Sequence, residues 1–353
     1  MNTPHFLLAK SVVLEQYRVA ANASDLLSYS SKTNPLITSI LENETADCFF
    51  SVHLHNELIN ITDKSRVLFL AQAWTSKDIE LLIAQQVSSF VVDNKADLNT
   101  LLEFLEQRTA VQINHLFLRI KLKELSLRTE KHYVFGMDSE FVNKKISEIH
   151  ESSLRSRIKN LGVHFHRKTQ NMSEWNLMYE TENMLSASTR SALDVINIGG
   201  GLPAAYASTN VDVIPTVLQK ISAFKAWLHE QNILLMIEPG RFISAPSVKL
   251  VTTIIGMHDN TLIVDASVYN SDMDALIVPV KLLVEGELSQ DEVGENYCVK
   301  GITPCSMDLF RYRVKLRAPQ IGDSLIFLHA GAYNFTTDFC NLQKIETVIV
   351  DEF

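Results

Sequence analysis

Short apolar runs alternate with longer amphipathic stretches from about residue 25 to residue 245, and this alternation constrains the fold most. Runs such as RVLFLAQ, SSFVVDN, HLFLRI and ILLMIEPG are rich in Val, Ile, Leu and Phe, and polar or turn residues follow them. Stretches such as KADLNTLLEFLEQ carry apolar residues at i, i+3 and i+4, which is the spacing of a helix. Strands buried on both faces and separated by helices indicate βαβ units with a parallel sheet.

About seven or eight such units fit a closed (β/α)8 barrel of ~250 residues better than an open sheet. After Pro246 the pattern changes to strands joined by Asp, Asn and Gly turns, without a convincing helix. We therefore predict an α/β protein with a barrel over residues 25–245 and an all-β domain over residues 246–353. Residues 1–24 are expected to pack with the β-domain. Because a barrel carries its chemistry at the C-terminal ends of its strands, the residues after each run deserve most weight.

Composition narrows the classes of partner. The chain has 353 residues, 46% hydrophobic content and a net charge of −9, without a basic stripe, so we expect no nucleic-acid partner. The N-terminus lacks the pattern of a signal peptide, and no segment approaches the ~20 apolar residues of a membrane helix. We therefore expect a cytoplasmic protein. The cysteines form no CxxC pair and show no zinc spacing, so no metal is expected.

Two glycine-containing segments follow strand-like runs. Gly199, Gly200 and Gly201 follow DVINI, and backbone N–H groups in such a segment can cradle a phosphate. Glu238-Pro-Gly-Arg241 follows ILLMI and brings an acid and a guanidinium to one strand end. The ordinary alternatives are a tight turn and a salt-bridged loop.

His166 ends LGVHFH, and Lys32 follows LLSYSS. Taken singly, His166 is more often a core histidine and Lys32 a solvated surface lysine. Together with the two segments above they form a set: a lysine, a planar aromatic ring, a carboxylate and two phosphate-binding elements. Such a set is what a site for pyridoxal 5'-phosphate (PLP) requires.

Ordered motifs along the chain make the resemblance specific. The chain resembles the fold-type III PLP decarboxylases, which include ornithine, diaminopimelate, arginine and carboxynorspermidine decarboxylases and have an alanine racemase-like barrel. YSSKTN resembles the family's Tyr-Ala-x-Lys-x-Asn, LGVHFHRKTQ its GVHxHxGSQ, and INIGGGLP its glycine-rich phosphate loop. EPGR matches letter for letter, GITPCSMD resembles GPxCxSxD, and GAY is also present.

The resemblance implies a role for each matching residue. It makes Lys32 the lysine that holds the cofactor, His166 the ring stacked on the pyridine, and Glu238 the partner of the pyridine nitrogen. Cys305, reaching in from the partner subunit of a homodimer with shared active sites, would protonate the α-carbon. The resemblance further implies cofactor contacts from Thr169, Gly199, Gly200, Gly201, Gly240, Arg241 and Tyr333, and substrate contacts from Arg119, Ser306 and Asp308.

The carboxylate at Glu238 favours decarboxylation, because an adjacent anion keeps the pyridine nitrogen protonated and able to accept electrons. Alanine racemases usually have an arginine there, so Glu238 and Cys305 disfavour an amino-acid racemase. A non-catalytic PLP-binding protein is the other alternative, and the domain over residues 246–353 counts against it, because such proteins are usually a single barrel.

Departures from the family bear on the substrate. Ser306 stands where ornithine and diaminopimelate decarboxylases have an acid, which argues against a simple diamino acid. Lys168 and Thr169 replace Gly-Ser near the phosphate, and either Ser51 or Asp47 stands for the family's acid after its second strand. The sequence thus favours an amino acid with a neutral or anionic far end, or an amino-acid group on a larger carrier. Specialised relatives of the microcin C or siderophore pathways use such carriers.

Overall fold

The computed structural model describes residues 4–122, 135–173, 175–209, 212–278 and 280–353. Contacts divide the chain into two compact units. The first, which we call the barrel unit, is formed by Arg18–Leu202 and Ile214–Gly240. The second, which we call the β unit, is formed by Met1–Tyr17, Pro203–Val213 and Arg241–Phe353. These limits differ from the domain limits expected at residues 24 and 245, which stay predictions.

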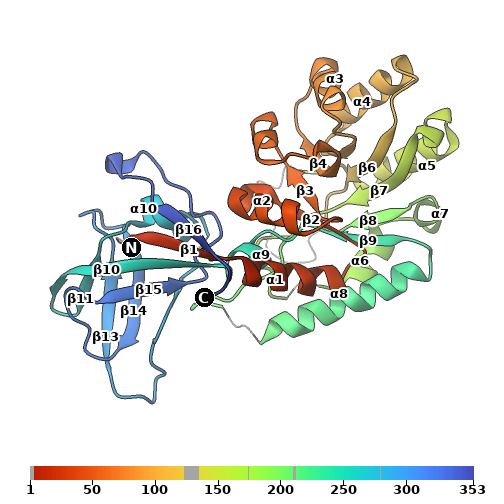
Figure 1. The fold of residues 1–353 in the computed structure, drawn as a ribbon. Helices are drawn as coiled ribbons and strands as arrows, with labels where there is room; N and C mark the ends of the chain where they lie inside the picture. The colour runs from red at the N-terminus through yellow and green to blue at the C-terminus, as the bar shows by residue number, and fades with distance from the viewer. Residues whose placement is uncertain (1–3, 123–134, 174, 210–211, 279) are drawn as a thin grey trace. The chain divides into compact units, whose positions relative to one another are not determined.

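The barrel unit contains a closed barrel of parallel strands, with β2 hydrogen-bonded to β9 to complete the ring (Figure 1). Its strands are β2 (Leu26–Ser30), β3 (Phe49–Val52), β4 (Val67–Ala71), β5 (Ser89–Val92), β6 (Ile113–Arg119), β7 (Ile158–His164), β8 (Val195–Asn197) and β9 (Leu234–Ile237). Buried apolar side chains from several strands, including Leu68, Phe117 and Met236, pack together in the core. The predicted (β/α)8 barrel is confirmed.

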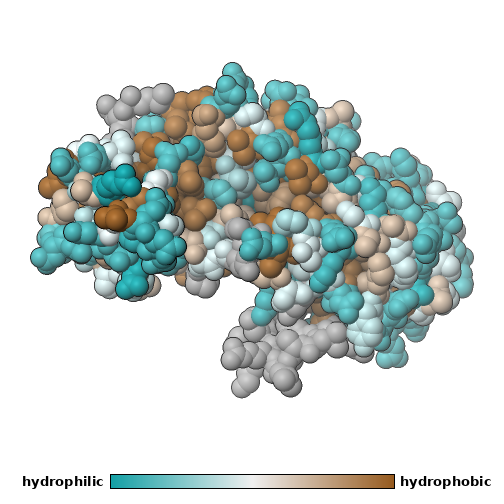
Figure 2. Space-filling model, turned by 90° about the horizontal axis from the view of Figure 1, so that it is seen from below, coloured by the Kyte–Doolittle hydropathy of each residue, from teal (hydrophilic) through white to brown (hydrophobic). Residues whose placement is uncertain are grey.

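Helices surround the barrel, and several of them begin at a residue whose side chain caps the helix. Asn94 accepts a hydrogen bond from the backbone of Asp97 at the start of α4, and Asp138 does the same for α5. On the right of Figure 2, the surface of the barrel unit is mostly hydrophilic. This is expected, because amphipathic helices turn their apolar sides toward the core. The helices are α1 (Lys10–Asn22), α2 (Pro35–Glu44), α3 (Ser76–Ala84), α4 (Lys95–Gln107), α5 (Ser139–Glu151), α6 (Leu177–Met184), α7 (Ala187–Ser191) and α8 (Val213–His229).

The second barrel strand, β3, departs from the sequence pattern. Its four residues, FFSV, were not among the apolar runs from which the barrel was inferred. Between β3 and β4 the chain forms only 3-10 helices, η2 (His55–Asn60) and η3 (Lys64–Arg66), in a stretch that is described throughout. A strand this short, without a following amphipathic helix, gives little periodic signal.

The β unit is built around one eight-stranded sheet, with strand order β12-β15-β10-β11-β13-β14 and with β1 pairing both β10 and β16. Its strands are β1 (His5–Ala9), β10 (Val248–His258), β11 (Thr261–Val264), β12 (Leu283–Val284), β13 (Glu295–Lys300), β14 (Leu309–Leu316), β15 (Ser324–Leu328) and β16 (Glu346–Val350). The unit is mostly β, as predicted, but it also contains short helical turns: α9 (Arg241–Ser244), α10 (Val268–Ser271), α11 (Asp274–Ile277) and η5 (Phe339–Asn341). Within the described residues, no helix has the length and apolar character to cross a membrane.

Candidate active site

Lys32 lies in a tight turn directly after β2, within the 3-10 helix η1 (Ser31–Thr33). Asn34 caps the following helix by accepting a hydrogen bond from the backbone N–H of Leu36, at 3.2 Å. The Tyr29 hydroxyl donates to the Asn34 carbonyl, also at 3.2 Å. The tyrosine and the asparagine of the YSSKTN motif therefore fix the turn that carries Lys32.

The end of β9 packs against this turn. The backbone N–H of Ser30 donates to the Pro239 carbonyl at 3.2 Å. A Cβ atom on Gly240 would lie 2.3 Å from Thr33 Oγ1, closer than any side chain allows. Gly240 is thus required for the EPG segment to approach the Lys32 turn.

Glu238 directly follows β9 and is only 4% exposed. Asn197 Nδ2 donates to Glu238 Oε1 at 2.7 Å, and Ser51 Oγ donates to Oε2 at 2.9 Å. Ser51 also shares a 2.7 Å hydrogen bond with Ser28. His164 Nε2 lies 3.3 Å from Glu238 Oε1, although at an angle outside hydrogen-bond geometry. Side chains from several strands therefore meet at one buried carboxylate.

These neighbours keep Glu238 ionised. Burial alone raises the pKa of Glu238, but the nearby histidines and the Asn197 amide outweigh it and lower the pKa to about 2. Burial also lowers the pKa of His164, so this ring is uncharged at neutral pH. It then no longer provides a positive charge beside Glu238. The hydrogen bonds from Asn197 and Ser51 remain in that state, and they favour the anion.

His166 stands beside the glycine segment. Its Nδ1 atom accepts a hydrogen bond from the backbone N–H of Gly200 at 3.2 Å. The N–H of Gly199 donates to Asn197 Oδ1 at 2.8 Å. Both N–H groups thus bond within the protein in this structure, and cofactor contacts from the glycine segment stay predictions. Gly199 has a φ of +64°, and a Cβ atom there would lie 2.7 Å from His166 Nδ1, so this glycine permits close packing.

The pKa values of Lys32 and His166 are both shifted toward the neutral forms of these side chains. The Lys32 side chain is exposed as a whole, but partial desolvation, the largest cause, holds its pKa below the ordinary value, although Glu238 opposes this shift. A larger share of the amine is therefore neutral and nucleophilic. Burial lowers the pKa of His166 to about 3, which leaves a neutral planar ring. With the Glu238 anion, these groups fit the lysine, ring and carboxylate contacts of PLP.

Arg241 lies in the β unit, where Asp274 and Tyr206 hold its guanidinium. Arg241 Nη2 donates to Asp274 Oδ1 at 2.9 Å, and Nη1 donates to the Tyr206 hydroxyl at 2.9 Å. The guanidinium carbon lies 5.3 Å from the centre of the Tyr333 ring. This arrangement matches the salt-bridged loop named above as the alternative for EPGR. Phosphate contacts from Arg241 and Tyr333 stay predictions.

Cys305 and Ser306 lie in the loop between β13 and β14, Cys305 half-buried and Ser306 exposed. Asp308, in contrast, is fully buried. Its carboxylate accepts hydrogen bonds from the backbone of Val268 at 2.9 Å and from the backbone and hydroxyl of Thr303 at 3.0 and 2.7 Å. This carboxylate therefore anchors the loop, and the substrate contact expected of Asp308 stays a prediction.

Arg119 and Thr169 were also predicted from the sequence, as substrate and phosphate contacts. Arg119 ends β6 and pairs with Asp93 at 2.9 Å, with the Phe135 ring 4.8 Å from its guanidinium carbon. Thr169 is exposed in the segment after β7. Their substrate and phosphate contacts stay predictions.

Sequence reasoning did not single out Asn197 or His164, and left Ser51 open against Asp47. Asp47 precedes β3 and is exposed, whereas Ser51 lies inside the barrel against Glu238. His164 could have been found, because residues at i and i+2 of a strand share a face and His166 was already selected. His53, just after β3, is also part of this environment: burial, the largest cause, and the nearby charge of Lys32 lower its pKa to about 4.

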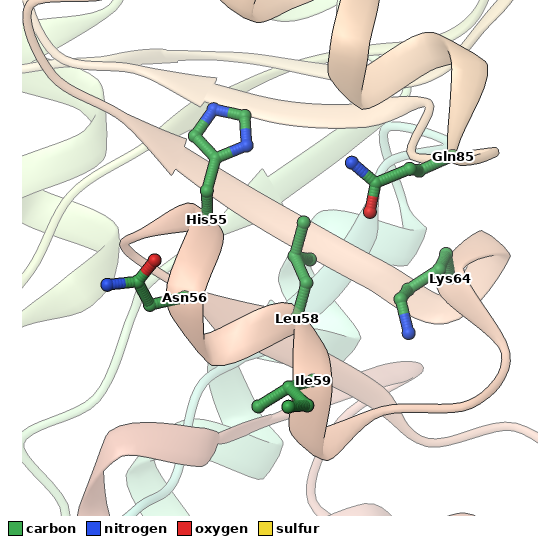
Figure 3. Close-up of a pocket in the computed structure, with 6 residues that line it drawn as sticks. All are labelled: His55, Asn56, Leu58, Ile59, Lys64 and Gln85. Atoms are coloured by element: carbon green, nitrogen blue, oxygen red, sulfur yellow. The ribbon is translucent and has the colours of Figure 1, made fainter.

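Figure 3 shows a hollow of about 540 Å³ on the outside of the barrel unit. It is lined by His55, Asn56, Leu58 and Ile59 of η2, with Lys64 and Gln85 on the other side. This set contains none of the predicted cofactor residues. In the described part of the chain, no group of His, Cys, Asp or Glu side chains could hold a metal ion.

Comparison with known proteins finds similarity to pyridoxal-dependent decarboxylases. Residues 23–245 match the family model "Pyridoxal-dependent decarboxylase, pyridoxal binding domain". Diaminopimelate decarboxylase of Archaeoglobus fulgidus is 23% identical over 94% of this chain and 84% of its own length. The diaminopimelate decarboxylase of Helicobacter pylori, solved with L-lysine, has a TM-score of 0.82 at 18% identity, covering 100% of this chain and 93% of that one. The lysine/ornithine decarboxylase of Vibrio vulnificus, solved with cadaverine, has a TM-score of 0.78 at 23% identity, covering 99% and 95%.

Proposed function

The chain belongs to the family of pyridoxal-dependent decarboxylases, and from that premise we propose which residues carry its reaction. The protein is a PLP-dependent amino-acid decarboxylase. Lys32 holds the cofactor, His166 lies on the face of its ring, and Glu238 bonds its pyridine nitrogen. The observation that carries this assignment is the buried Glu238 carboxylate with its Asn197 and Ser51 donors.

Each residue has a separate task. When bound, PLP supplies a protonated ring that accepts the electron pair left by the departing carboxylate. Glu238 keeps the proton on that ring, because its carboxylate is held ionised. The family resemblance assigns further cofactor contacts to the glycine segment Gly199–Gly201 and to Thr169, Gly240, Arg241 and Tyr333. Cys305 donates the proton that the α-carbon receives after carbon dioxide leaves.

The family resemblance supports a homodimer in which Cys305 of one subunit serves the Lys32 site of its partner. Mixing inactive Lys32→Ala and Cys305→Ala proteins should then restore part of the activity, since some mixed dimers contain one complete site. Absence of recovery, despite proven subunit exchange, would mean that each site is built within one chain. A cytoplasmic location is part of the same proposal.

The substrate is an amino acid whose far end is neutral or anionic, or an amino-acid group on a larger carrier. Ser306 supports this proposal, because a serine cannot pair a distal ammonium as the family's acid would. The alternative substrates are diaminopimelate, lysine and ornithine, which the related enzymes named above suggest. Carriers such as those of peptide-antibiotic or siderophore biosynthesis fall within the proposed class.

The test is carbon dioxide release from a panel of substrates. The panel contains ornithine, lysine, meso-diaminopimelate, glutamate and a peptide-linked or nucleotide-linked aminocarboxypropyl group. We expect the highest kcat/KM with an anionic or carrier-linked member. Efficient cleavage of a diamino acid, near the ~10⁴ M⁻¹s⁻¹ of ordinary enzymes, would overturn the substrate proposal but not the decarboxylase assignment.

A further inference from the structure

Tyr269 and Cys305 come together in the β unit, although 36 residues separate them. The Tyr269 hydroxyl lies 3.4 Å from Cys305 Sγ, within hydrogen-bond range for sulfur. The Tyr269 ring is held by a second contact, because it stacks on Phe339 with a centroid distance of 3.9 Å and an interplanar angle of 20°. The phenol is therefore directed at the thiol by a packed ring.

Backbone contacts hold Tyr269 from two sides. Its N–H donates to the Ser267 hydroxyl at 3.2 Å, as part of the cap of α10. Its carbonyl accepts from both the N–H and the hydroxyl of Thr337, each at 3.0 Å. A side chain whose backbone and ring are both held loses little freedom when it makes one more hydrogen bond.

The loop of Cys305 is tied to the same helix. Asp308 accepts from the backbone N–H of Val268, the residue before Tyr269, and its own N–H donates to the Cys305 carbonyl at 3.1 Å. The buried residue Asp308 therefore links the helix of Tyr269 to the loop of Cys305. This link fixes the distance between the hydroxyl and the thiol.

Either group can donate while both are protonated, but a thiolate can only accept, so the phenol is the donor once Cys305 has lost its proton. The bond from Tyr269 is the largest cause that lowers the pKa of Cys305, and the same bond raises the pKa of Tyr269 to about 12. The phenol thus keeps its proton, and its O–H group donates a hydrogen bond to the sulfur when the thiolate forms. The other titratable groups near the pair are Asp308 and Cys340, and negative charge on either would oppose a thiolate or a phenolate. Tyr269 is the neighbour that favours the thiolate.

We propose that Tyr269 is a positioning residue for Cys305, directing the S–H group and stabilising the thiolate that forms when the proton leaves. The inference rests on the proposed role of Cys305. In that step the S–H bond breaks, a C–H bond forms on the substrate α-carbon, and the electron pair stays on sulfur. Tyr269 donates its hydrogen bond to that electron pair, and water returns the proton to sulfur afterwards.

The test is Tyr269→Phe in the full-length holoenzyme, since phenylalanine keeps the ring that stacks on Phe339. Alkylation of Cys305 by iodoacetamide is followed against pH by peptide mass mapping, which separates Cys305 from Cys298 and Cys340. We expect the midpoint for Cys305 to move to higher pH, and kcat to fall roughly tenfold with KM unchanged. Tyr312→Phe, at a 77% exposed tyrosine of the same unit, is the matched control and should change neither value.

The outcomes separate this inference from the proposed function. An unchanged midpoint in Tyr269→Phe overturns the inference. A shifted midpoint with wild-type kcat, while Cys305→Ala is inactive, overturns its catalytic part. If Cys305→Ala itself keeps full activity, the proposed role of Cys305 fails, and with it the proposed role of Tyr269, whatever the midpoint shows.

Discussion

Glu238 in the barrel unit and Asp308 in the β unit are both buried carboxylates, but the groups around them differ. Glu238 receives side-chain donors from other strands, Asn197 and Ser51, and its neighbours include two histidines. Asp308 receives backbone N–H groups and the hydroxyl of nearby Thr303. The first arrangement fixes a charge at the C-terminal end of the barrel strands, and the second fixes the path of a loop.

The difference teaches how the two units divide the chemistry. In the barrel unit the Glu238 carboxylate is buried beside an exposed Lys32 side chain, so the charge of Glu238 acts in a low dielectric and small changes around it have large effects. In the β unit the reactive thiol is partly exposed, and what is buried is the anchor behind it. Substitutions in the barrel should therefore change the chemical step most, and substitutions at Asp308 should change the stability and order of the loop.

The largest effect is expected for Lys32→Ala. Because both covalent attachment of the cofactor and an acid–base group are lost, kcat/KM should fall by more than about 10⁴-fold. Steady-state carbon dioxide release measures it. Lys144→Ala, at a side chain that is 72% exposed, is the control and should retain wild-type activity. Full activity of Lys32→Ala would remove the lysine from the site.

Glu238→Gln is expected to come next. Loss of the anion that holds the pyridine proton should slow decarboxylation by a few powers of ten, about 3–5 kcal/mol of barrier. Glu103→Gln, on the exposed face of α4, is the matched control. Wild-type rates in Glu238→Gln would refute the electron-sink role of this residue.

The same substitution has a signature in stability against pH. The pKa of Glu238 is lowered from 4.5 to about 2, so its ionised form stabilises the fold above pH 4.5. That contribution is lost as the pH falls from 4.5 toward 2. Urea unfolding of the wild type should show this loss, and Glu238→Gln should show a smaller pH dependence over the same interval. Equal pH dependence would place the pKa of Glu238 near its ordinary value.

Asp308→Asn tests the other side of the comparison. An amide cannot accept from all three donors without directing an N–H₂ group at one of them, so the free energy of unfolding should fall by about 2–4 kcal/mol. Alkylation of Cys305 should become faster, while borohydride labelling of Lys32 stays unchanged. Asp291→Asn, at an exposed position of the β unit, is the control. Unaltered stability would show that the anchor is dispensable.

The smallest effect belongs to Ser51→Ala. The variant loses one hydrogen bond to Glu238, about 1.5–3 kcal/mol for a bond to a charged group, and activity should fall by roughly 10- to 150-fold. In a Glu238→Gln background the further loss should be much smaller, because the two residues act together. Additive losses would mean that Ser51 acts independently of the Glu238 charge.

The sequence predicted the barrel, the β-rich domain and the positions of Lys32 and Glu238, because strand ends and ordered motifs carry local signals. It did not predict the contacts of Glu238. Asn197 and Ser51 reach this carboxylate because of the register of strands that are far apart in the chain. Arg241 shows the same limit: its partner Asp274 lies 33 residues away.

Sodium borohydride reduction of the holoenzyme, followed by peptide mass mapping, tests the central claim most directly. Reduction fixes the cofactor on the amine that holds it, so the mass of the reduced cofactor should appear on the peptide that contains Lys32. Removal of the cofactor before reduction should abolish the label. A label on another lysine, or no label on a holoenzyme that releases carbon dioxide, would contradict the account.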